Sequence, residues 1–372
     1  MAQFCHEFAI LHDHMARMTK HISIDPAEKV AFEDREMLRA AAKLTRDLVH
    51  PNPAIYWGDF LASALIGYAG VAVAILAQPL WMALAAAAIA VLALYRAGSF
   101  IHEITHMKDG AVPGFRLGWN LVVGIPLMVP SFMYEGVHNL HHARTRYGTV
   151  EDPEYLPLAL MKPWTVPVFV AVSALAPLAL ILRYGILTPL SFVIPPLRKL
   201  VVERYSGLVI NPAFRRKFPE GDQRRNWLWQ ETGASLWALF LIIGTATGLL
   251  PLKAVAIFLG IAGAAVVLNQ IRTLVAHLWA NDGDVLTVTE QYLDSVNVPP
   301  PGLLPALWAP VGLRYHALHH LLPTLPYHAL GEAHRRLSAE LGETSAYHRA
   351  NYKGLPGLVT QLVRGTVHGV SR

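Results

Sequence analysis

The sequence predicts an all-α integral membrane protein, a helical bundle of about four spans with additional re-entrant or hairpin segments. The chain of 372 residues is 53% hydrophobic but only 15% charged, whereas about 25% of the residues in a typical soluble domain are charged. Several apolar stretches approach the roughly 20 residues that a transmembrane helix requires. Basic residues are concentrated between these stretches.

The clearest predicted spans form two hairpins. Residues 59–77 and 80–98 are separated by a two-residue break, so these two spans are expected to be antiparallel neighbours. Residues 234–250 and 254–276 are expected to form a second hairpin around Pro251.

Two further apolar stretches do not read as simple spans. Residues 164–197 contain Pro167 and Pro177, and proline interrupts a helix. We therefore expect a hairpin or a re-entrant pair there. Residues 117–130 are too short to span, so they are expected to be re-entrant or buried.

Charge predicts the orientation of the spans. The segment 198–225 is rich in Lys and Arg, whereas the tips of the two hairpins carry only Lys253. The positive-inside rule then places this segment, both termini and every histidine cluster on the cytoplasmic side of an inner (cytoplasmic) membrane.

The chain divides into three predicted regions. Residues 1–58 form a polar cytosolic leader with no signal peptide, in which residues 25–49 are expected to form an amphipathic helix on the membrane surface. Residues 59–335 form the membrane domain with a cytosolic cap, and residues 336–372 form a cytosolic tail.

Composition also limits the possible cofactors and partners. The single cysteine, Cys5, cannot hold an iron–sulfur cluster, so any electrons must come from a separate ferredoxin- or cytochrome-type protein. The sequence has no basic patch interleaved with aromatic residues, so it gives no indication of nucleic-acid binding.

Nine of the eighteen histidines form a pattern that indicates metal binding. Residues at i, i+3 and i+4 share one face of a helix, so each box can direct several imidazoles to one place. Nine imidazoles exceed the needs of one ion and suit two, and imidazole is a ligand of iron, zinc, copper and nickel. An open site beside lipid favours O2 activation by iron. The boxes are HxxxH (His102, His106), HxxHH (His138, His141, His142) and HxxHH (His316, His319, His320), with His277 at the end of the last span.

The first box also reads HEITH, the pattern of a zinc metalloprotease in which Glu103 would be the general base. That alternative needs a third ligand, for which Asp282 or Asp284 is available, and it leaves the two HxxHH boxes without a role. In the two-metal interpretation Glu103 instead accepts the second ring N–H of a ligand histidine. Asp152, Glu135 and Glu154 are candidates for the same task.

From about residue 60 to about residue 330 the chain resembles the integral-membrane fatty acid desaturases of the desaturase–hydroxylase superfamily. The resemblance rests on the three histidine boxes and on the continuation HHLLPTLPYHAL after the third. It implies a cytosolic helical cap that holds a histidine-only diiron site above an apolar acyl channel. Thr273 stands where acyl-CoA members of the family have an Asn that reaches a metal through water.

The resemblance implies O2-dependent desaturation of a membrane acyl lipid, with two iron ions and an external electron donor. Oxidation of an unactivated methylene requires a metal and O2, because such a C–H bond has no useful acidity. The same ligands also support hydroxylation, so a lipid or carotenoid hydroxylase or ketolase is the alternative. A membrane scaffold or metal-storage protein without turnover is a further, non-enzymatic alternative.

Overall fold

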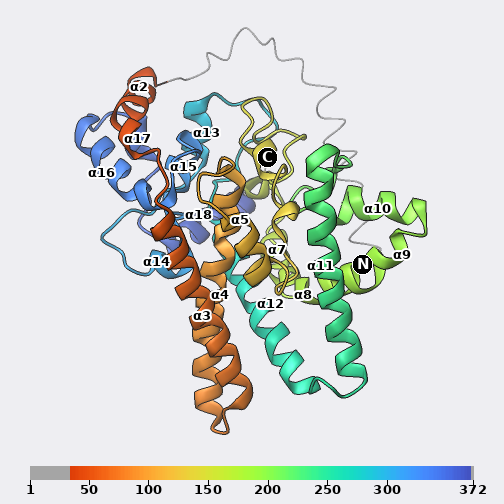
Figure 1. Cartoon of the computed structure of the whole chain (residues 1–372). Helices are drawn as coiled ribbons and strands as arrows, with labels where there is room; N and C mark the ends of the chain where they lie inside the picture. Colours follow the sequence, from red (N-terminus) through yellow and green to blue (C-terminus); the bar gives the residue numbers. More distant parts are fainter. Residues whose placement is uncertain (1–33, 370–372) are drawn as a thin grey trace.

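The computed structural model describes residues 34–369, and within them the chain is helical, with only isolated β-bridges. Two long hairpins, α3 (Pro53–Leu76) with α4 (Leu80–His106) and α11 (Gly221–Ala246) with α12 (Leu252–Leu274), extend toward the same end of the molecule (Figure 1). The shorter helices gather around the opposite ends of these hairpins. The predicted all-α membrane architecture is confirmed.

The long helices begin where the sequence provides a start. Asn52 accepts hydrogen bonds from the amides of Ala54 and Ile55, and Pro53 occupies the first turn of α3. Proline is favoured there because its missing N–H would have no partner in the helix. Pro79 and Pro251 likewise precede α4 and α12.

Three helices, α3, α4 and α12, are long and apolar enough to cross a membrane, and a bent pair raises the number to as many as four. The predicted span at 234–250 lies in α11 up to residue 246, and α11 is not among the three. Its first half carries the polar run at 221–226 and Glu231.

The bent pair lies in the stretch 164–197, for which the sequence predicts either a hairpin or a re-entrant pair. Residues Thr165–Ser173 and Ala176–Ser191 meet at an angle of 54°, and Pro177 lies in the first turn after the break. The pair is therefore a broken span or a re-entrant segment and not a hairpin with antiparallel arms. It contains α7 (Thr165–Ser173), α8 (Ala176–Leu182), the π-helix η5 (Arg183–Leu187) and α9 (Thr188–Ser191).

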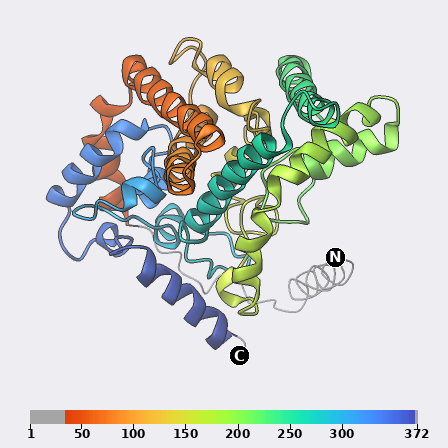
Figure 2. The ribbon, with the colours of Figure 1, turned by 90° about the horizontal axis from the view of Figure 1, so that it is seen from below.

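Seen from the hairpin tips, α12 runs between the α3–α4 hairpin and the α7–α8 pair (Figure 2).

The predicted re-entrant or buried stretch at 117–130 contains two short helices. The remaining short helices are α5 (Phe115–Trp119), η2 (Asn120–Gly124), η3 (Ser131–Met133), α6 (His138–His141), η4 (Leu158–Leu160), α10 (Pro195–Tyr205), α13 (Val288–Asp294), α14 (Pro305–Trp308), α15 (His316–Leu321), η6 (Tyr327–Ala329), α16 (Leu330–Glu340), α17 (Ala346–Arg349) and α18 (Leu355–Gly369).

The helix predicted at 25–49 to lie on the membrane surface instead packs against other helices in its described part. Its described part is α2 (Arg35–Leu44) with the 3-10 turn η1 (Arg46–Leu48), and residues 25–33 lie outside the described part of the chain. Met37 and Ala41 are buried with Ala333 and Leu337 of α16. The apolar face of α2 is therefore covered by protein, because α16 offers a complementary apolar face. The predicted domain boundary at 335/336 falls inside α16.

Close packing of small residues holds the α3–α4 hairpin together. A Cβ atom on Gly70 would lie 3.0 Å from the Ala86 carbonyl oxygen and 3.0 Å from the Ala90 Cβ. Small residues at such contacts let helix backbones approach closely in membranes.

We predict that Gly70→Val lowers the stability of the detergent-purified protein by roughly 1–3 kcal/mol, since overpacking at a tight contact forces the helices apart. Gly98→Val is the matched control, because a Cβ on Gly98 of the same hairpin meets no atom within 4 Å. Thermal unfolding of the two variants measures the difference. Equal melting temperatures would show that this contact does not hold the hairpin.

Candidate metal centre

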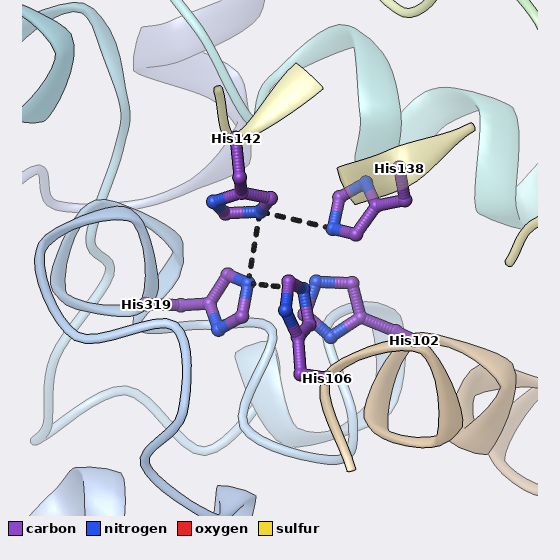
Figure 3. A group of neighbouring side chains, drawn as sticks. All are labelled: His102, His106, His138, His142 and His319. Carbon is purple, nitrogen blue, oxygen red and sulfur yellow. Dashed lines mark hydrogen bonds between the residues drawn. The ribbon is translucent and has the colours of Figure 1, made fainter. Parts of the chain in front are cut away.

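The nine histidines predicted from the sequence lie in two adjacent groups. In the first group, five rings each direct one nitrogen into a common space, with these nitrogens within 4.8 Å of one another (Figure 3). The Nε2 atom of His142 lies 3.0 Å from Nε2 of His138 and 3.1 Å from Nε2 of His319. The members of this group are His102, His106, His138, His142 and His319.

The second group contains His141, His277, His316 and His320, again with one nitrogen each within 4.8 Å of the others. The Nε2 atom of His316 lies 3.1 Å from Nε2 of His277 and 3.2 Å from Nε2 of His320. All four side chains are buried or nearly so.

Helix periodicity explains how the boxes divide between the groups. Residues four apart on a helix lie one above the other, and the pairs His102/His106 and His138/His142 each enter the first group. The pair His316/His320 enters the second group. The middle histidine of each HxxHH box, three residues after the first, enters the other group, so both boxes contribute to both groups.

The donor set suits metal ions. A neutral imidazole has one N–H and one lone pair, and here the Nε2 atoms face one another with no carboxylate between them. Both ring nitrogens of His102 are buried without a hydrogen-bond partner within residues 34–369. Burial holds the pKa values of His138, His142 and His319 well below the ordinary value, which keeps these rings neutral with a lone pair free for a metal.

Two carboxylates contact histidines of these groups on the side away from the common space. Asp152 is fully buried, and its two oxygens lie 3.0 and 2.9 Å from Nδ1 of His141. Burial alone would lower the pKa of His141, but the Asp152 carboxylate raises it above the ordinary value. Glu154 lies 3.0 Å from Nδ1 of His138, and burial raises its pKa to about 7. An N–H held at Nδ1 leaves the Nε2 lone pair directed toward the metal space.

Tyrosines complete this outer layer, and the sequence analysis did not find them. The Tyr134 hydroxyl donates to Glu154 at 3.0 Å. The Tyr147 hydroxyl lies 2.8 Å from Nδ1 of His277 and donates to Asp294 at 2.8 Å. These residues carry no recognisable motif, because their role depends on contacts between distant parts of the chain.

Arg272 makes a different kind of contact. Its guanidinium, which can only donate, lies 3.3 Å from Nδ1 of His316. This contact favours the lone pair of His316 on Nδ1, the opposite tautomer to the one that binds a metal through Nε2.

The other predicted site residues are placed elsewhere. Glu103 accepts from the Tyr56 hydroxyl at 2.5 Å and from the Tyr327 amide at 3.0 Å, while 3.8 Å separates it from Nδ1 of His102, too far for a hydrogen bond. Glu135 contacts Arg116 and Ser131 instead of a histidine.

Thr273 lines the cavity beside the histidines. Neither histidine group includes Asp282 or Asp284, the third ligands required by the protease alternative.

A cavity of about 950 Å³ extends from the histidines along the α7–α8 pair. His102, His138 and His316 are among the lining residues, and apolar residues of α7 and α8 make up much of the remaining wall. Leu175 and Leu178 line the cavity and are also more than half exposed at the break between α7 and α8. The size and largely apolar lining suit a long-chain lipid, and the exposed leucines indicate that the cavity reaches the surface beside the bent pair.

Comparison with known proteins agrees with this site. The model of the fatty acid desaturase family matches residues 79–352. The chain belongs to this family. A ceramide hydroxylase of Caulobacter vibrioides (strain NA1000 / CB15N) is 52% identical over 331 residues, which cover 89% of this chain and 94% of the relative. A comparison with solved structures finds no match.

The relative overturns desaturation as the predicted reaction. A near-full-length relative in this family is named as a hydroxylase, so the findings support the hydroxylase alternative. The prediction was wrong because the histidine pattern is common to both reactions, and the outcome depends on how the substrate lies beside the metals.

The family and the geometry together support an oxidoreductase of the membrane that acts on a lipid. The two histidine groups fit the diiron site of the desaturase–hydroxylase superfamily.

We predict that Glu154→Gln weakens metal binding roughly 10- to 100-fold, because removing the charge behind His138 makes the ring a poorer ligand. Glu135→Gln is the matched control, since Glu135 contacts no histidine. Titration of the metal-free protein with ferrous ion under anaerobic conditions measures both variants. Equal affinities would show that Glu154 does not support the ligand.

Proposed function

We propose that the protein hydroxylates an amide-linked membrane lipid of the ceramide class, using O2 and two iron ions held by the nine histidines. The observation that carries the proposal is the apolar cavity, which ends at both histidine groups and opens beside the predicted spans. The ceramide hydroxylase at 52% identity supports both the reaction and the class of lipid. A carotenoid substrate has no comparable support.

The reaction balances with an external reductant. One C–H bond of the lipid becomes C–OH with one oxygen atom of O2, and the second oxygen atom leaves as water after taking up two electrons and two protons. The electrons would come from a separate ferredoxin- or cytochrome-type protein, and the single cysteine of this chain cannot hold an iron–sulfur cluster. Bound iron supplies the activation of O2 that no side chain provides.

The residues of this chain provide positioning and exclusion of water. The histidines would hold the metals where they line the cavity, and Asp152 and Glu154 fix two of their rings. The apolar walls of the cavity exclude water from the acyl chain and hold one segment of it against the reactive end. Effective catalysis of this kind depends on placement at about the ångström scale.

Orientation in the membrane forms part of the proposal. The hairpin tips and the basic segment 198–225 lie toward opposite ends of the molecule. The positive-inside rule then puts the histidine end, where an electron donor must dock, in the cytoplasm of the inner membrane.

We predict that expression in a host that makes ceramide yields a lipid with one added oxygen atom that derives from isotopically labelled O2. The double variant His138→Ala, His319→Ala should abolish the product, because it removes two nitrogens of the first group. Mass spectrometry of the host lipids measures both results. A product with a new double bond and no added oxygen would contradict the proposal.

A further inference from the structure

The cavity has one polar patch that the proposed reaction does not use. Asn269, Gln270 and Thr273 line the cavity from α12. Their spacing places Asn269 and Thr273, and also Gln270 and Thr273, on one side of the helix. The patch lies toward the end of α12 that leads to His277.

Within the described residues these side chains have no partner, in contrast to the other amide and hydroxyl side chains that line the cavity. Within residues 34–369 no hydrogen bond or ion pair involves the side chain of Asn269, Gln270 or Thr273. By comparison, the Ser173 hydroxyl donates to the Val170 carbonyl, and the Thr165 hydroxyl donates to the Lys162 carbonyl. The partnerless amides are therefore a specific property of α12.

Asn269 is exposed and Gln270 is half-buried where they line the cavity. When a lipid fills the cavity, amides without a partner become costly on a helix that is apolar enough to span a membrane. Polar side chains at such positions are rare and generally serve a function in the protein interior. An amide carries two N–H donors and a carbonyl acceptor. Its best partner in an apolar cavity is a ligand group that also both donates and accepts.

We infer that Asn269 and Gln270 bind the amide linkage and adjacent hydroxyl of the lipid, and so select an amide-linked substrate over an ester. This inference rests on the proposed function and names the residues that would determine its substrate. The secondary amide of a ceramide offers one N–H and one carbonyl, which match an Asn or Gln side chain. An ester offers acceptors only, so one of the bonds to the patch is lost.

The position of the patch also determines where the lipid is oxidised. At 1.5 Å per residue, Gln270 lies about 6 Å along the helix axis from the end of α12 at Leu274, and His277 follows shortly after that end and lines the same cavity. A lipid amide held there places carbons near the amide beside the histidines. The remainder of the chain then runs toward Leu175 and Leu178 at the opening. The hydroxyl group is accordingly added within a few bonds of the amide and not near the methyl end.

The test compares a ceramide with its ester analogue, in which oxygen replaces the amide N–H, in the wild type and in Asn269→Leu, Gln270→Leu. Binding of each lipid to metal-free protein in nanodiscs is measured by competition with a fluorescent ceramide. Turnover is measured separately by mass spectrometry. The wild type should bind the ceramide about 10-fold more tightly than the ester, the scale of one lost hydrogen bond, and the double variant should bind both equally.

Two controls keep the result decisive. Gln78→Leu makes the same chemical change at an exposed position between α3 and α4 and should keep the wild-type preference. The exchange Asn269→Gln, Gln270→Asn retains both amides and should retain a preference for ceramide. This control distinguishes recognition by the amides from a general effect on folding.

A double variant that still binds ceramide about 10-fold more tightly than the ester would overturn the inference. So would a wild type without preference. If the wild type prefers ceramide but yields no hydroxylated product, the proposed function fails while the assignment of the lipid-binding patch stands. A product hydroxylated near the methyl end would overturn the predicted position of oxidation.

Discussion

The structure depends on the convergence of nine imidazoles in a buried space. Neutral imidazoles whose Nε2 atoms face one another lose hydrogen bonds to water, and the protein groups opposite these atoms are other imidazoles. The two ring nitrogens of His102 show this most clearly. Two metal ions would satisfy these nitrogens, and metal binding would then contribute directly to the stability of the fold. The surrounding elements can be understood as the means of bringing the four histidine segments together.

Glu103 illustrates how the helices are joined near this space. Its carboxylate accepts from Tyr56 on α3 and from the backbone amide of Tyr327, shortly after the third box. The Tyr327 hydroxyl in turn donates to Asp59 on α3, which also pairs with Arg96 of α4. Glu103 therefore ties the third histidine box to the first hairpin, a structural role in place of the predicted contact with a ligand histidine.

Much of the site follows from short-range sequence patterns. The length of the apolar stretches predicted α3, α4 and α12. The spacing of the histidines in the three boxes, with the position of His277 at the end of a span, predicted which nine residues meet. What could not be predicted depends on contacts between distant segments. The pairing of Tyr147 with His277 joins residues 130 positions apart, and no local pattern distinguishes Tyr147 from other tyrosines. Likewise, the sequence of α2 predicts a membrane-surface helix, and only the structure shows that α16 covers its apolar face. The choice between forming a double bond and forming an alcohol is not encoded in the histidine pattern.

The most direct test of this account is the metal stoichiometry of each histidine group. Iron content and Mössbauer spectra would be measured on anaerobically loaded wild type, on His106→Ala from the first group and on His320→Ala from the second. We expect about two irons per chain in the wild type and about one in each variant, with a different spectral component lost in each case. A single metal ion per chain that survives loss of His320 would contradict the two-metal site and restore the HEITH protease interpretation.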